Sequence, residues 1–185
     1  MSWNFVPLDS VTPQPWKNGG GTTRELLAWP QAEGWKVRLS VADVTAAGPF
    51  SRFEGIERWF SVLEGEGVVL KVAGGRHWLR ADSEPFRFDG GLATDCELSN
   101  GSTRDLNLMA PPGRSRMRRL QPAEQMFKMR GPGLLAIYAH SQPSRVILDW
   151  VNVDVPAYTL AWRWCGEAMS GIARGADALL MEAQA

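Results

Sequence analysis

The chain has 185 residues, with 20 basic and 20 acidic side chains, so its formal net charge is zero. A hydrophobic share of 44% and a charged share of 22% are typical of globular proteins and exclude a disordered chain. Without an excess of positive charge, binding to nucleic acid or to an anionic membrane would depend on a local patch, and we expect neither partner.

The sequence shows no signal for export or for a membrane span. No apolar run approaches the roughly 18 residues that cross a bilayer, and the first residues form neither a basic region nor an apolar signal core. Cys96 and Cys165 are too few and too far apart for a disulfide framework. We therefore expect a soluble, cytoplasmic protein.

After a short edge strand at residues 2–12, the chain enters the glycine-rich segment 16–25, which contains three consecutive glycines. Glycines lower both helix and strand propensity, so they are useful here for positive φ or for close approach to the backbone. Bare amides could cup an anion, and the flanking Lys17 and Arg24 would add positive charge. The alternative is an ordinary turn with solvated polar residues, followed by a short strand or irregular segment at residues 22–29.

Residues 35–42 alternate strictly between apolar and polar side chains, which predicts a half-buried strand. Arg38 and Ser40 share its polar face, but the alternation does not say which face points inward. A loop with two aromatic rings follows at residues 48–55. Further short strands are predicted at the following ranges: 58–63, 68–72, 76–81, 85–88, 96–98 and 105–109, with Gly74-Gly75 as a hairpin turn.

The Pro111-Pro112-Gly113 sequence marks the expected boundary between domains 1–110 and 111–185. Strands are predicted beyond it at residues 126–130, 134–140, 145–150 and 157–164, whereas residues 176–183 fit a strand or a short helix. Many short strands with turn signals between them indicate an all-β sandwich or barrel. The arginines at 114–119 are interpreted as a solvated or interface segment.

The sequence contains no metal-binding or nucleophile motif. Its two histidines, His77 and His140, are far apart, and there is no Cys-x-x-Cys pair, so we expect no metal and no cofactor. Arg38 or Arg58 is expected to form an ion pair with Asp105, because a buried charge needs a partner. The alternative is that these faces are simply the solvent side of the sheet.

Four ordered motifs resemble those of the HutD/Ves family: residues 15–25 (PWKNGGGTTRE), 35–40 (WKVRLS), 48–58 (GPFSRFEGIER) and 105–109 (DLNLM). The resemblance implies a bicupin, with a fuller barrel in the first domain and a less complete cupin-like barrel in the second. It leaves open whether the N-terminal strand pairs with the second barrel. It also implies a bacterial association with histidine utilisation or with a stress-induced relative, and no established catalytic activity.

We expect a metal-free cupin that binds a small carboxylate, urocanate or formylglutamate, as a sensor or regulator linked to histidine utilisation. The alternative is a metal-independent isomerase, lyase or hydrolase of a small acid, with Lys17 or Asp105 as base; a homodimer, and a sugar- or protein-binding surface formed by tryptophans, are left open. The expected ligand-binding residues come from the glycine-rich segment, three strands and one loop: Trp16, Lys17, Asn18, Gly19, Gly20, Gly21, Thr22, Arg24, Arg38, Ser40, Phe50, Ser51, Arg58, Asp105 and Asn107.

Overall fold

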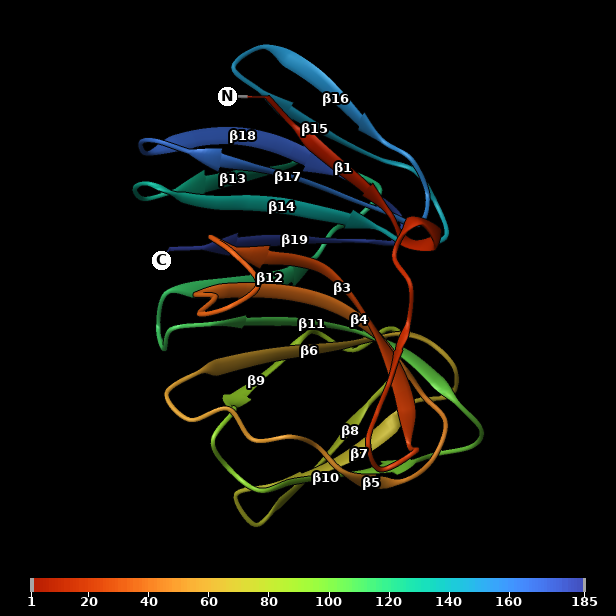
Figure 1. The fold of residues 1–185 in the computed structure, drawn as a ribbon. Coiled ribbons are helices and arrows are strands. Elements are labelled where there is room, and N and C mark those ends of the chain that lie inside the picture. The colour runs from red at the N-terminus through yellow and green to blue at the C-terminus, as the bar shows by residue number, and fades with distance from the viewer. Residues whose placement is uncertain (1, 185) are drawn as a thin grey trace. The chain divides into compact units, whose positions relative to one another are not determined.

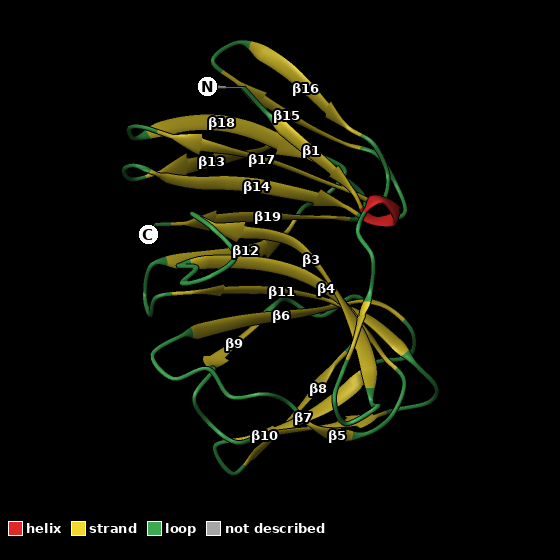
Figure 2. Cartoon of the chain, viewed as in Figure 1, coloured by secondary structure: helices red, strands yellow, loops and turns green. Residues whose placement is uncertain are grey.

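The computed structural model describes residues 2–184, and this part of the chain is built almost wholly from antiparallel strands (Figures 1 and 2). Its one helical segment is the 3-10 turn η1 (Leu8–Ser10), and no helix within the described residues is long and apolar enough to cross a membrane. The contacts divide the chain into two compact units. We call residues 12–113 the N-terminal unit, and residues 2–11 together with 114–184 the C-terminal unit.

The N-terminal unit consists of two antiparallel sheets that enclose a core. The six-stranded sheet has the order β2 (Gln14–Pro15), β3 (Gly21–Trp29), β4 (Val37–Val44), β11 (Thr103–Ala110), β6 (Glu57–Glu64) and β9 (Phe86–Asp89). The four-stranded sheet has the order β5 (Gly48–Pro49), β10 (Thr94–Leu98), β7 (Val68–Val72) and β8 (Gly75–Leu79). Side chains from both sheets, such as Phe60 and Leu70, pack in one cluster, so the sheets face each other.

The C-terminal unit repeats this plan. Its five-stranded sheet has the order β1 (Asn4–Pro7), β17 (Thr159–Cys165), β14 (Gly133–Ala139), β19 (Ala178–Ala183) and β12 (Ser115–Arg119). Its four-stranded sheet has the order β13 (Gln125–Met129), β18 (Met169–Arg174), β15 (Ser144–Leu148) and β16 (Val151–Val155). The N-terminal strand β1 therefore belongs to a sheet whose other strands all follow residue 114, through its pairing with β17.

Two ambiguous segments are resolved as strands. The alanine-rich end of the chain forms β19, because it pairs with β14 on one side and β12 on the other and is buried along most of its length; tertiary packing overrides the helix propensity of alanine. Residues 21–29 form a continuous nine-residue strand, β3. The β7–β8 hairpin is confirmed, but its turn is Ala73-Gly74, one residue earlier than expected, since Gly75 already pairs with Val72.

Strand β4 differs from the expected half-buried strand, because both of its faces are covered. Val37, Leu39 and Val41 have no exposed surface, and Ser40 and Ala42 on the opposite face are only 4% and 5% exposed. The face with Ser40 and Ala42 is the one that looks into the N-terminal unit, where Ala42 joins the shared core cluster. The polar side chains on this face are therefore interior groups, and the solvent-side alternative is wrong.

Candidate functional site

The N-terminal unit contains a cavity of about 490 Å³ next to the inner face of the six-stranded sheet. The segment before β3, strands β4, β6 and β11, and the loop after β5 all contribute to its wall. Nine of the residues expected at a ligand site line it: Trp16, Lys17, Asn18, Arg38, Ser40, Phe50, Ser51, Arg58 and Asn107. Segments widely separated in the sequence thus converge on one hollow.

Strand register explains why these side chains meet. Side chains alternate between the faces of a strand, and residues abreast on β4, β11 and β6 form three successive inward rungs: Arg38, Met109 and Arg58; Ser40, Asn107 and Phe60; Ala42, Asp105 and Val62. The first rung carries two arginines and the second a hydroxyl and an amide. A cationic rung therefore lies beside a rung of neutral hydrogen-bonding groups.

Arg58 is buried at the cavity wall, with 7% of its surface exposed. Its Nε and Nη2 donate to Oδ1 of Asn107 over 2.9 and 2.7 Å. Its guanidinium carbon lies 4.5 Å from the ring centre of Phe50 and 5.6 Å from that of Phe88. Burial lowers the pKa of Arg58 to about 10, with Asp105 opposing the change, so the group stays cationic at neutral pH. Asn107 and the two rings hold this cation in place and leave Nη1 for a further acceptor.

Arg38 and Lys17 bring two more positive charges to the cavity. The Nε of Arg38 donates to Oε2 of Glu25 over 2.6 Å, and its guanidinium carbon lies 5.9 Å from the ring centre of Trp35. Lys17 is exposed at the cavity wall. Protonated arginine and lysine donate hydrogen bonds and have no lone pair for a metal, so these cationic residues favour an anion and do not fit a metal cation.

Aromatic side chains complete the wall. Trp16 donates from Nε1 to Oγ1 of Thr23 over 2.7 Å, and its ring meets Phe50 edge-on with the ring centres 6.1 Å apart. Phe50 in turn lies 5.9 Å from Phe60. The cavity thus combines cations with flat apolar surfaces, a combination that suits a small, planar organic anion.

The glycine-rich segment does not form the expected anion cup. Gly19 donates its amide to the carbonyl of Trp16, and Gly20 donates to Oδ1 of Asn18, each over 3.0 Å. Gly19 has φ +72, and a Cβ on Gly21 would overlap the carbonyl oxygen of Asp43. The glycines therefore shape a tight turn against β4, and this turn brings Trp16, Lys17 and Asn18 to the cavity.

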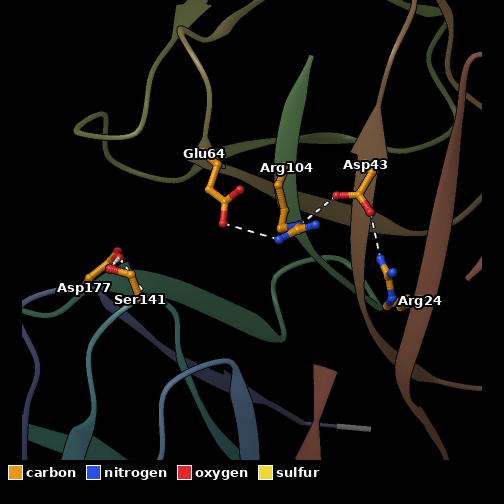
Figure 3. Close-up of polar contacts among 6 residues, drawn as sticks. All are labelled: Arg24, Asp43, Glu64, Arg104, Ser141 and Asp177. Carbon is orange, nitrogen blue, oxygen red and sulfur yellow. Dashed lines mark hydrogen bonds and ion pairs between the residues drawn. The ribbon is translucent and has the colours of Figure 1, made fainter. Parts of the chain in front are cut away.

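Thr22 and Arg24 are also absent from the cavity lining, because alternation along β3 directs Thr23 inward and its two neighbours to the opposite face. Arg24 Nη1 lies 2.7 Å from Oδ2 of Asp43, and Arg104 joins Oδ1 of Asp43 to Glu64 (Figure 3). Burial alone would raise the pKa of Asp43, but hydrogen bonds from Arg104 and Arg24 outweigh it and hold the pKa below its usual value. Arg24 therefore belongs to an ion-pair network.

Asp105 does not form the expected ion pair. Arg58 bonds to Asn107 and Arg38 to Glu25, while Oδ2 of Asp105 accepts from Oγ1 of Thr103 over 2.9 Å. Oδ1 of Asp105 has no hydrogen-bond partner, and the residue is fully buried. Burial raises the pKa of Asp105 to about 8, although the Thr103 hydrogen bond and the charge of Arg58 both act to lower it. At neutral pH the Asp105 side chain is mainly a neutral acid beneath the cavity lining.

Several lining residues were not expected from the sequence: Gln14, Pro15, Thr23, Ala42, Pro49, Phe53 and Met109. Alternation could have found two of them, because Ala42 and Met109 follow Ser40 and Asn107 by two positions. Phe53 lies in the loop that already supplied Phe50 and Ser51. Within residues 2–184 no group of three or more histidine, cysteine, aspartate or glutamate side chains is placed to hold a metal.

The sequence profile of the HutD family matches residues 9–161, a range that includes every residue lining the cavity. The chain belongs to the HutD family. As a HutD-family chain it is all-β, with a cupin-like fold.

Three proteins similar to this HutD-family chain are described by their sequence identity and by the share of each chain that the alignment covers. A Pseudomonas putida protein described as an uncharacterised 21.2 kDa protein in the hutC 3′ region is 40% identical over 106 residues, 56% of each chain. Protein Ves from Citrobacter koseri is 35% identical over 119 residues, 63% of this chain and 61% of Ves. The alignment thus spans little more than half the length of these curated relatives. The solved HutD from Pseudomonas fluorescens is 27% identical, with a TM-score of 0.82 over 98% of this chain and 97% of that one.

Proposed function

We propose that the cavity of the N-terminal unit binds a small carboxylate, and that the protein acts as a sensor or regulator linked to histidine utilisation. Urocanate and formylglutamate are the candidate ligands. The observation that carries the proposal is the pair Arg38 and Arg58, which lie in one rung and line one cavity together with Lys17.

The geometry of Arg58 favours binding of a carboxylate in particular. Guanidinium groups match the two oxygens of a carboxylate, and a charge-assisted hydrogen bond contributes about 1.5–3 kcal/mol. Asn107, Phe50 and Phe88 already fix the guanidinium, so the ligand need not supply the roughly 0.5–1.5 kcal/mol that ordering a long side chain costs. Two such arginines and an aromatic wall are compatible with micromolar binding, which corresponds to about 8 kcal/mol.

The link to histidine utilisation comes from the relatives. The Pseudomonas putida relative is described by its position next to hutC, and the Pseudomonas fluorescens structure carries the name HutD. The enzyme alternative has less support, since one of its two candidate bases, Asp105, is fully buried and does not line the cavity.

Isothermal titration calorimetry with urocanate and formylglutamate tests the proposal. We expect micromolar binding of at least one acid to the unmodified protein and a loss of tenfold or more in affinity for Arg58→Gln. Arg24→Gln is the matched control, because it removes an arginine on the opposite face of the same sheet, and it should bind with unchanged affinity. Absence of heat with both acids, or equal affinities for Arg58→Gln and the unmodified protein, would refute the proposal.

A further inference from the structure

The buried carboxyl of Asp105 is a group that carboxylate binding, as described so far, does not use. It lies on β11 in the rung next to Asn107, and side chains two residues apart on a strand are separated by about 7 Å. Asn107 in turn holds Arg58 by two hydrogen bonds. Oδ1 of Asp105 has no hydrogen-bond partner and the residue has no exposed surface. A group that can gain or lose a charge therefore lies two rungs from the arginine pair, with Asn107 in the rung between them.

The charged or titratable side chains coupled to Asp105 come from β6, β4 and β10. Arg58 on β6 is cationic, and Asp43 on β4 is kept ionised by Arg104 and Arg24. Cys96 on β10 stays a neutral thiol, because burial, with Asp105 adding to it, raises its pKa to about 12. On β11 itself the hydroxyl of Thr103 donates to Oδ2. Among these groups, Asp105 is the one whose charge changes between pH 7 and 9, since burial raises its pKa to about 8.

We propose that carboxylate binding in this cavity is coupled to protonation of Asp105, so that the bound anion and the proton on Asp105 stabilise each other. The inference rests on the proposed function, because it requires an anion beside Arg58. Because the Arg58 guanidinium bonds to Asn107 in the rung between, such an anion would lie roughly 8–14 Å from Asp105, at about 7 Å a rung. At an effective dielectric constant of about 20, two unit charges at that separation change each other's equilibria by roughly tenfold to thirtyfold.

The direction of the effect follows from the charges. Well below pH 8, Asp105 is neutral with or without ligand, and affinity does not vary with pH through this residue. Above pH 8 the ligand-free protein loses the proton, and the anion then binds beside a second negative charge. Affinity falls as pH rises until Asp105 is ionised in the complex as well. Near pH 8–9 binding must therefore be accompanied by proton uptake.

The experiment is calorimetry with N-formylglutamate between pH 6.5 and 9.5, on the unmodified protein and on Asp105→Asn. The carboxyl groups of this probe titrate near pH 4, so its own charge is constant across the range. We expect the affinity of the unmodified protein to fall by roughly tenfold across this range, because Asp105 in the complex is only partly ionised at pH 9.5. Asp105→Asn should keep the affinity measured at pH 6.5 to within about twofold, the remaining change coming from Arg58 as pH approaches its pKa of about 10. Asp95→Asn, which changes an exposed carboxyl on β10, should behave as the unmodified protein does.

A second measurement needs no variant and therefore does not depend on the folding of Asp105→Asn. Titrations at pH 8.5 in buffers of different ionisation enthalpy report the protons taken up on binding, and we expect a fractional uptake. Binding without proton uptake, or a pH dependence that persists in Asp105→Asn, would overturn the coupling and leave the proposed function standing. Absence of binding at every pH, with urocanate as well as with N-formylglutamate, would overturn the proposed function and the coupling with it.

Discussion

The two units have the same two-sheet plan but differ in what their central strands direct inward. In the N-terminal unit the middle rung across β4, β11 and β6 consists of Ser40, Asn107 and Phe60. In the C-terminal unit the rung across β17, β14 and β19, the three middle strands of the five-stranded sheet, consists of Ala161, Ile137 and Leu180, which belong to one apolar cluster. The interior of the N-terminal unit therefore has a wall of hydrogen-bonding side chains, whereas apolar side chains pack the interior of the C-terminal unit.

This difference shows that a few inward positions on central strands separate a cavity with a polar wall from a packed core. Each unit pairs a larger sheet with a four-stranded one, and the central strands are buried in both: Asn107 is 2% exposed and Ile137 is fully buried. Function in such folds is carried by sites placed on a shared framework. Exchanging polar and apolar residues between the two interiors therefore tests the comparison directly.

The largest effect is expected from Ile137→Asn, which puts an amide into the filled interior. Loss of the buried side chain and burial of an amide without a designed partner should together lower the stability of the C-terminal unit by about 4 kcal/mol. Urea unfolding measures the change. Met126→Asn is the control, because Met126 is 79% exposed, and it should change stability by less than about 0.5 kcal/mol. Equal stabilities of Ile137→Asn and Met126→Asn would show that the C-terminal interior tolerates an amide, which would contradict its description as a packed apolar core.

Relative to the unmodified protein, Asp105→Asn should gain about 3 kcal/mol of stability between pH 5 and pH 7. A carboxyl whose folded-state pKa is raised to about 8 from 3.8 contributes stability that is present below pH 4 and is lost as pH rises to about 8. The neutral amide does not suffer this loss, so the difference between the two proteins grows over that window and is constant above it. Chemical unfolding at several pH values measures it, and a pH-independent difference would contradict the buried-acid assignment.

Asn107→Leu makes the N-terminal interior resemble the C-terminal one. This substitution should lower the free energy of unfolding by about 2 kcal/mol. It removes the acceptor of two hydrogen bonds from Arg58 and leaves a buried cation without that partner. Adding Arg58→Met should recover most of the stability, because an apolar pair can replace a buried polar one at little cost. Neither variant should bind the carboxylate ligand with the original affinity. A failure of the second substitution to restore stability would show that Asn107 acts through another neighbour.

The smallest effect is expected at two hairpin turns, one in each unit, where a residue other than glycine adopts a positive φ. Trp150 and Ala73 each adopt a positive φ, of 63 and 51, in two-residue turns. Trp150→Gly and Ala73→Gly should each raise stability by about 0.5–1 kcal/mol, since glycine adopts this conformation without strain. Thermal unfolding measures both shifts. Loss of stability in either variant would mean that its side chain makes contacts that outweigh the strain.

The sequence predicted the all-β fold and the family, because alternation, turn pairs and four ordered motifs are local patterns. It also placed Arg38 and Ser40 on one face and Asp105 and Asn107 on one face. It could not assign partners across strands: Arg58 lies abreast of Met109, a register that depends on how β6 aligns with β11. Likewise, the sequence alone does not show which of the two strand arginines, Arg24 or Arg38, points to the cavity. The phase of β3 and β4 in the folded sheet directs Arg38 to the cavity and Arg24 to Asp43.

The complete covering of β4 has a consequence for how a signal could leave the cavity. A strand that is enclosed on both faces and paired along both edges should exchange its amide hydrogens slowly and open only when the whole unit opens. Ligand occupancy can then hardly deform the sheet. Changes in exchange on binding should be confined to the turn around Asn18 and the loop around Ser51, which makes those two surface segments the place to look for a readout of occupancy.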